Sequence, residues 1–167
     1  MRSERINFLA VVTAVAGLTG FIGVYAKWFS YSYPVGGGTV TIYLDGTWDG
    51  TGAIAFAAGI GALLFGCAYI LLTDPAIRRI VALLMVISSM ALLVSSAIGF
   101  TRLDETIGPN PLLPGAEGQT PFEATVAIGL AMSLSSGIIA TVASVLLVAR
   151  REAGLEEQAE LSAAATA

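Results

Sequence analysis

The sequence has no histidine, a single cysteine and few charged residues, and each scarcity excludes a class of function. Without histidine, the commonest general base, haem ligand and zinc ligand is missing. Cys67 alone cannot form an intramolecular disulfide or a redox pair. Charged residues make up 12% of the 167 residues, against about 25% in an average soluble domain. The composition therefore argues against an enzyme, a disulfide-stabilised scaffold and a soluble domain.

The sequence also lacks a phosphate-binding loop between a strand and a helix. Gly36, Gly37 and Gly38 precede a strand pattern rather than a helix, so the helix N-terminus that would bind an anion is missing. The adjacent carboxylates Asp104 and Glu105 are typical of a solvated loop. We predict no catalytic residue, no cofactor and no nucleic-acid partner.

Long uncharged runs are what the sequence does have. Four of them contain no Asp, Glu, Lys or Arg: residues 6–26, 53–72, 80–100 and 124–149. About 20 apolar residues cross a hydrocarbon core roughly 30 Å thick. A charge at mid-bilayer costs about 3 kcal/mol, so clean runs of this length indicate a lipid solvent. The sequence predicts an all-α membrane protein, a four-helix transmembrane bundle within residues 1–151.

The basic residues fix the expected orientation, because arginines near the ends of spans tend to stay in the cytoplasm. Six of the eight basic residues lie at span ends that alternate as one cytoplasmic side requires, and only Lys27 and Arg102 lie on the opposite side. We expect a multi-pass protein of the cytoplasmic membrane with both termini inside, outer loops at 27–52 and 101–120, and an acidic cytoplasmic tail at 152–167. The arginines that set this orientation are Arg2, Arg5, Arg78, Arg79, Arg150 and Arg151.

Small residues recur at helical spacing along the runs. In lipid, helices gain little hydrophobic energy from meeting, so stripes of small residues that admit close backbone approach determine how they pack. We predict that such stripes form the contacts between helices. Their members include Gly17, Gly20, Gly23, Gly59, Ala62, Gly66, Gly129, Ser133 and Gly137.

Serines in the third and fourth runs leave a second interpretation open. A serine in a helix can return its hydroxyl to a backbone carbonyl one turn earlier, which is a sufficient structural reason for its presence. The same hydroxyls could line a polar path if several copies assembled, although ion pathways usually also carry an ionisable residue. The serines concerned are Ser88, Ser89, Ser95, Ser96, Ser133, Ser135 and Ser136.

Helix starts are marked at two places. Asp74 and Pro75 form a cap and a first helical position before the third run. Residues 120–123, Thr-Pro-Phe-Glu, form a capping box, so we expect the fourth helix to begin at Pro121. Residues 101–120 are rich in proline and glycine and predict a turn-rich loop. Residues 162–167 are expected to be disordered.

The first outer loop has the pattern of a β-hairpin. Residues 39–44 alternate with a period of two, and Asp45-Gly46 is a turn dipeptide. Residues 28–33 also alternate, and Pro34 with the three following glycines supplies the bend. We expect a small extracytoplasmic hairpin with an aromatic face that rests on the helix ends, on the second outer loop or on a partner.

The aromatic residues of this loop are the candidate site. Trp and Tyr favour the headgroup level of a membrane, and they also anchor protein interfaces. Both interpretations can hold together. The acidic residues around Asp45 and Asp49 could suit calcium, but their spacing matches no EF-hand, and we assign no metal site. The candidate interface residues are Trp28, Tyr31, Tyr33, Tyr43 and Trp48.

The order of these parts resembles small four-span prokaryotic membrane proteins of mostly unassigned function. The resemblance rests on residues 45–50, Asp-Gly-Thr-Trp-Asp-Gly, on residues 51–55, on Arg78-Arg79 and on residues 126–130. The layout also resembles that of claudins, with Trp28 and Gly46-Thr47-Trp48 at comparable places. The leucine and the two loop cysteines of claudins are absent, so the resemblance implies the architecture alone.

We therefore expect a non-enzymatic membrane accessory, assembly or structural subunit. It would dock to a larger membrane complex, or to copies of itself, through the outer hairpin and a small-residue helix face. One alternative is an oligomeric channel or transporter for a small solute, and another is a claudin-like, self-associating adhesion or barrier protein. A cofactor-holding or enzymatic subunit is a third possibility.

Overall fold

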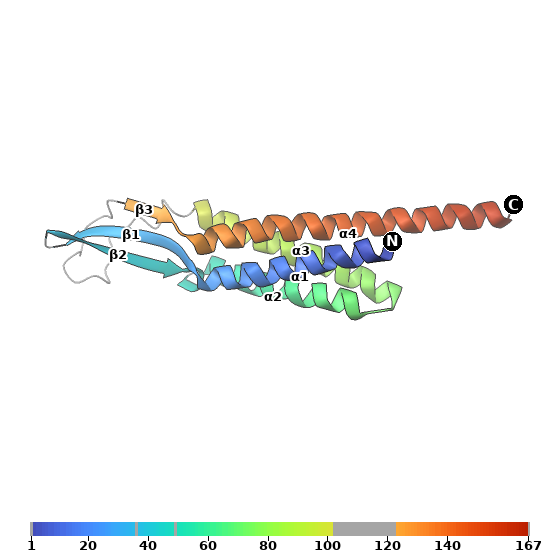
Figure 1. Cartoon of the computed structure of the whole chain (residues 1–167), viewed down its shortest axis with the longest axis horizontal. Helices are drawn as coiled ribbons and strands as arrows, with labels where there is room; N and C mark the ends of the chain where they lie inside the picture. The colour runs from blue at the N-terminus through green and yellow to red at the C-terminus, as the bar shows by residue number, and fades with distance from the viewer. Residues whose placement is uncertain (1, 36, 49, 102–122, 167) are drawn as a thin grey trace.

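The protein is mostly helical, with a small sheet beyond one end of the helices (Figure 1). The computed structural model describes residues 2–35, 37–48, 50–101 and 123–166. The helices are α1 (Arg2–Tyr25), α2 (Gly50–Leu71), α3 (Pro75–Thr101) and α4 (Ile128–Thr166). The strands are β1 (Lys27–Val35), β2 (Gly38–Asp45) and β3 (Glu123–Val126), and a short 3₁₀ helix, η1 (Gly46–Trp48), follows β2.

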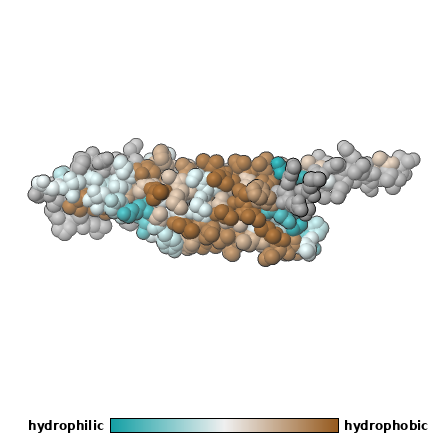
Figure 2. Space-filling model, in the orientation of Figure 1, coloured by the Kyte–Doolittle hydropathy of each residue, from teal (hydrophilic) through white to brown (hydrophobic). Residues whose placement is uncertain are grey.

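Four helical segments are long and apolar enough to cross a membrane, as the uncharged runs predicted. They are Asn7–Tyr25, Gly50–Leu71, Pro75–Thr101 and Ile128–Gly154. Large apolar side chains such as Phe8, Leu64 and Ile87 are exposed on these helices. Figure 2 shows hydrophobic residues covering the middle of the helices and hydrophilic residues gathered toward their ends. Such a surface suits helices whose sides contact lipid.

The helices pack in a ring in which each contacts its two neighbours in the order α1, α2, α3, α4, while α1 and α3 lie across the diagonal. Glycine makes the closest approaches possible. A Cβ atom added to Gly17 would lie 2.6 Å from the Leu63 amide nitrogen, and one added to Gly129 would lie 2.6 Å from the Gly23 carbonyl oxygen. At these two positions, the backbones of α1 and α2, and of α1 and α4, are thus too close to admit a side chain.

Arginines and a cap close the end of the bundle away from the sheet. The Asp74 carboxylate accepts hydrogen bonds from the Ala76 amide (2.8 Å) and the Ile77 amide (3.1 Å), so α3 begins at Pro75 as the cap predicted. Arg78 donates its Nε–H to the Tyr69 carbonyl at 3.1 Å, near the last turn of α2. Arg151 of α4 donates to the Pro75 carbonyl. Arg78 thus satisfies a carbonyl in the last turn of α2, where a helix leaves its carbonyls unpaired, and Arg151 ties α4 to the start of α3.

The fourth helix begins later than the capping box predicted. α4 starts at Ile128 rather than at Pro121, and Glu123–Val126 form β3 instead of helix. The β3 backbone pairs with β1, where Phe29 faces Val126 and Ser32 faces Glu123. Pairing with a distant strand therefore outweighs the local helix signal. Residues 120–122 of the capping box lie outside the described residues, as do residues 102–119 of the predicted loop.

The other end of α4 also differs from the prediction. The helix continues to Thr166, whereas residues 162–167 were expected to be disordered. Ala, Glu, Leu and Gln dominate residues 152–165, and these are strong helix formers. Figure 1 shows this part of α4 projecting past the other three helices.

The sheet is antiparallel with the strand order β2-β1-β3. The hairpin prediction is confirmed for β1 and β2, which pair from Val35 with Gly38 down to Lys27 with Asp45. Gly37 in the turn has a φ of 86°, a left-handed conformation that glycine adopts without strain. The third strand, which lies in the segment predicted to begin the fourth helix, was not predicted. It ties the segment before α4 to the segment after α1.

Candidate functional site

The sheet has one buried face and one exposed face. Phe29, Tyr31 and Tyr33 are buried, and they alternate with the half-buried Ser30 and Ser32. On β2 the partners of these aromatic residues, Ile42 and Leu44, pack against the same hydrophobic cluster. On the other face, the hydroxyls of Ser32 and Thr41 are hydrogen bonded at 3.2 Å.

A β-bulge at Trp28 joins the sheet to the helices. The register between β1 and β2 shifts between Lys27 and Phe29, so Trp28 and Phe29 are both buried although they are neighbours. The Trp28 indole Nε1–H donates to the Gly23 carbonyl at 3.0 Å. Its ring lies where a Cβ atom at Gly46 would come within 2.5 Å and one at Gly99 within 2.8 Å. Trp28 therefore holds together α1, α3 and the start of η1.

The connection from β2 to α2 is tightly seated. The Asp45 carboxylate accepts hydrogen bonds from the Thr47 amide (2.9 Å) and the Thr47 hydroxyl (2.5 Å), which closes a local turn. At Gly52, an added Cβ atom would lie 1.3 Å from the Gly46 carbonyl oxygen. This position admits glycine alone in the observed backbone.

The Asp45 carboxylate is thus held by a turn. Within residues 2–35, 37–48, 50–101 and 123–166, no three His, Cys, Asp or Glu side chains gather where a metal ion could be held. Asp49, the other acidic residue of the calcium hypothesis, lies outside those ranges, as do the adjacent carboxylates Asp104 and Glu105.

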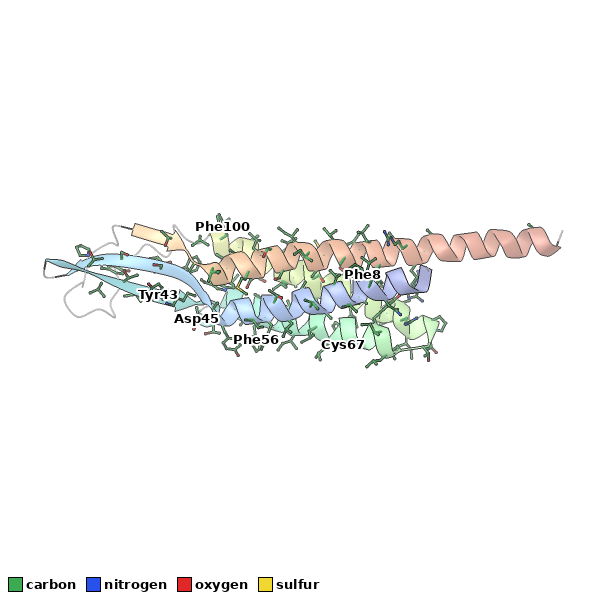
Figure 3. The ribbon with its side chains drawn as sticks, viewed as in Figure 1. Phe8, Tyr43, Asp45, Phe56, Cys67 and Phe100 are labelled. Carbon is green, nitrogen blue, oxygen red and sulfur yellow. The ribbon has the colours of Figure 1, made fainter. Side chains whose placement is uncertain are left out.

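The candidate interface residues divide into two groups. Trp28, Tyr31 and Tyr33 are between 2% and 3% exposed and belong to the hydrophobic core of the chain. Tyr43 is 51% exposed, and the Lys27 ammonium lies 3.5 Å from its ring centroid. The side chain of Trp48 lies outside the described part of the chain. Among these aromatic residues, Tyr43 is the one whose described ring is available to a partner, and Figure 3 shows it on β2 with Asp45.

Sequence reasoning missed a second aromatic group, at the end of α1 and α2 beside the sheet. The ring centroids of Phe21 and Phe56 are 5.0 Å apart, and those of Tyr25 and Phe56 are 5.5 Å apart. Tyr25 is 58% exposed. The four-residue spacing between Phe21 and Tyr25 was the available signal, because it places both rings on one helix face. This group has the composition of an interfacial belt.

The predicted small-residue stripes lie at contacts between helices of this chain. An added Cβ atom at Gly59 would lie 3.0 Å from the Gly17 carbonyl oxygen, and one at Gly137 would lie 2.7 Å from the Leu93 Cα. Ser133 donates its hydroxyl to the Gly20 carbonyl at 3.2 Å. These surfaces are therefore occupied within the bundle. The remaining members, which are buried or meet a neighbouring helix in the same way, are Gly23, Ala62, Gly66 and Gly129.

Three of the seven serines bond to their own helices, Ser133 bonds to α1, and the buried Ser96 hydroxyl has no hydrogen-bond partner among the described residues. Ser89 donates to the Met85 carbonyl at 2.7 Å, and Ser95 donates to the Ala91 carbonyl at 2.7 Å. Ser135 donates to the Ala131 carbonyl at 2.8 Å. A hydroxyl that is bound to its own backbone is less available to coordinate a solute. This arrangement favours a structural role over the lining of a channel.

The outer edge of β2 is the remaining feature with binding capacity. β2 lies at the edge of the sheet, and residues 38–41 are exposed. Val40 is 40% exposed, and together with Tyr43 it makes up the large hydrophobic side chains that are exposed outside the helices in the described residues. An edge strand offers unpaired N–H and C=O groups to another strand.

Comparisons with protein-family models and with curated proteins find no match for this chain.

Proposed function

We propose that this protein is a non-enzymatic accessory or assembly subunit of the cytoplasmic membrane that docks to a partner through its outer sheet. The four apolar helices would cross the bilayer with both termini in the cytoplasm. Arg78 and Arg79 near the start of α3 support this orientation, because α3 begins at the end of the bundle away from the sheet (Figure 1). Arg150 and Arg151 of α4 support it too, since Arg151 bonds to the Pro75 carbonyl where α3 begins. The sheet would then stand in the extracytoplasmic solvent.

The exposed edge of β2 carries this proposal. The glycine stripes are used within the bundle, and Trp28, Tyr31 and Tyr33 are used within the core. Val40 and Tyr43 are left as apolar groups on a strand that would face water. Aromatic side chains of this kind contribute disproportionately to binding energy. The partner is either a larger membrane complex or a second copy of the chain.

The test compares recovery of the partner by two variants. Wild-type protein is co-expressed with a differently tagged copy of the chain and is extracted with its lipids in polymer-bounded discs. Mass spectrometry then quantifies the co-purifying proteins, including the second copy. Loss of a hot-spot aromatic costs about 2 kcal/mol, so we expect Tyr43→Ser to lower recovery of the partner by roughly thirtyfold. Ile128→Ser is the matched control, since Ile128 is 69% exposed at the start of α4. If wild type, Tyr43→Ser and Ile128→Ser recover equal amounts of the partner, the proposal that the sheet docks to it is wrong.

A further inference from the structure

The hydrogen bonds within the sheet determine which backbone groups of β2 point away from β1 and pair with no other described strand. The Ala127 amide donates to the Trp28 carbonyl at 2.8 Å, which continues the β1–β3 ladder. Even-numbered residues of β1 therefore direct their backbone groups toward β3, and odd-numbered residues direct theirs toward β2, because neighbouring residues point to opposite sides. Pro34 is consistent with this alternation. It has no N–H to donate, and it stands at an even-numbered position beyond Ser32, where β3 no longer pairs with β1.

The same phase extends to β2. Phe29, Tyr31 and Tyr33 face Leu44, Ile42 and Val40, respectively. These even-numbered residues of β2 therefore form the ladder with β1. The amides and carbonyls of Thr39, Thr41 and Tyr43 point outward, away from the sheet.

We propose that two copies of the chain pair antiparallel through their β2 edges, with Thr41 of one copy opposite Thr41 of the other. In this register Thr39 faces Tyr43 across the dimer axis, so outward-pointing residues meet outward-pointing residues and exchange both hydrogen bonds. On the opposite face of the sheet, Val40 lies next to Ile42 of the second copy. Both exposed apolar side chains of β2, Val40 and Tyr43, thereby gain a cross-strand neighbour.

Charge favours a second copy as the occupant of this edge. The chain carries a net charge of −4, yet residues 38–44, Gly-Thr-Val-Thr-Ile-Tyr-Leu, contain no charged residue and no proline. Edge strands that avoid pairing with another copy usually carry a charged residue or a proline. The register centred on Thr41 also leaves Asp45 outside the overlap. Like charges therefore do not oppose each other along the pair.

The direction of pairing sets the geometry of the dimer. The strands run along the long axis of the molecule (Figure 1). An antiparallel partner must point the other way, so the two helix bundles extend in opposite directions. The inference rests on the proposed function, in which the sheet stands outside the membrane. The two copies then belong to facing membranes and bridge them.

Disulfide trapping tests the register directly. In a Cys67→Ala background, Thr41→Cys places two thiols across the axis with Cα atoms about 5.5 Å apart, within disulfide range. Thr39→Cys is the matched control, because its two copies are offset by four residues along the strands, about 13 Å. We expect at least tenfold more covalent dimer with Thr41→Cys after mild oxidation in detergent. Equal yields from the two variants, or no dimer from either, would overturn the pairing.

A proline variant tests the hydrogen bonds. Thr41→Pro removes an outward amide and leaves the β1–β2 ladder intact, whereas Thr41→Ala keeps the amide. The assay measures the clustering of proteoliposomes by light scattering. We expect Thr41→Ala to cluster them at the wild-type rate, and we expect the initial clustering rate with Thr41→Pro to be at least tenfold lower. Clustering by Thr41→Pro at the wild-type rate would refute the proposal. The disulfide assay gives the result by itself if Thr41→Pro fails to fold.

The two proposals can fail separately. If Thr41→Cys gives no disulfide while Tyr43→Ser still loses a different co-purifying protein, self-pairing is wrong and docking stands. If Tyr43→Ser changes no recovery and Thr41→Cys gives no disulfide, both are wrong.

Discussion

The contact of Trp28 with Gly46 predicts an energetic coupling between the sheet and the helices. The perturbation is Gly46→Ala, which would place a Cβ atom 2.5 Å from Cε2 and 2.7 Å from Nε1 of the indole. Trp28 is 2% exposed, so its ring has little room to withdraw. Overpacking of this kind costs about 1–3 kcal/mol. Gly50→Ala is the control, because a Cβ atom there meets nothing within 4 Å.

The second perturbation, Trp28→Phe, replaces the indole with a smaller ring, which gives the aromatic side chain room to move away from the new methyl group. It also removes the hydrogen bond to the Gly23 carbonyl, which still accepts from the Ala26 amide at 3.2 Å. Because the carbonyl keeps a partner, we expect this bond to contribute about 1 kcal/mol. Gly46→Ala should then cost at least about 1 kcal/mol less in the Trp28→Phe background than in wild type.

The assay is reversible unfolding in mixed micelles with increasing SDS, followed by circular dichroism, on wild type, the two single variants and the double variant. The coupling is the difference between the two costs of Gly46→Ala. If those costs agree within about 0.5 kcal/mol, the two sites are additive and the inferred contact is wrong.

Two further predictions concern orientation and helix packing. In a Cys67→Ala background, a membrane-impermeant maleimide added to intact cells should label Thr39→Cys readily and Glu152→Cys only after permeabilisation; the reverse pattern would invert the proposed topology. Ser133→Ala should lower stability by about 0.6 kcal/mol through loss of its hydrogen bond to α1, measured as a shift in the SDS midpoint, and an unchanged midpoint would show that this bond is not stabilising.

The sequence was sufficient to predict the four helices and the hairpin, because both rest on local patterns. Length and the absence of charge indicate a candidate span, and two alternating segments separated by Pro34 and three glycines indicate a hairpin. The third strand could not be found in this way. Glu123–Val126 pairs with β1, which is distant along the chain, and the neighbouring residues carry a strong helix-start signal. Thr125 and Val126, both β-branched, were the weak local indication of a strand.

For the candidate site, the sequence indicated a set of aromatic residues but not which of their rings are exposed. Alternation on β1 showed that Tyr31 and Tyr33 share a face, but it could not show whether the protein or a partner covers that face. Both are buried in the chain. The bulge that buries Trp28 beside Phe29 breaks the alternation, and no residue type specifies it. β2 is an edge strand because β3 pairs with the other side of β1. The position of the edge therefore follows from the strand order of the whole sheet and not from a local pattern.

The sheet also constrains the order in which the molecule can be completed during synthesis. β1 leaves the ribosome early, whereas β3 follows roughly ninety residues later, which at 5–20 residues per second is a delay of about 5–20 s. Throughout that interval both flanks of the nascent β1–β2 hairpin are open. β3 covers the open flank of β1 only after the first three helices have been made. Until then, two unfinished chains can pair through this flank of β1, which is closed in the finished molecule. Release of the last helix thus acts as the step that removes this early route to misassembly.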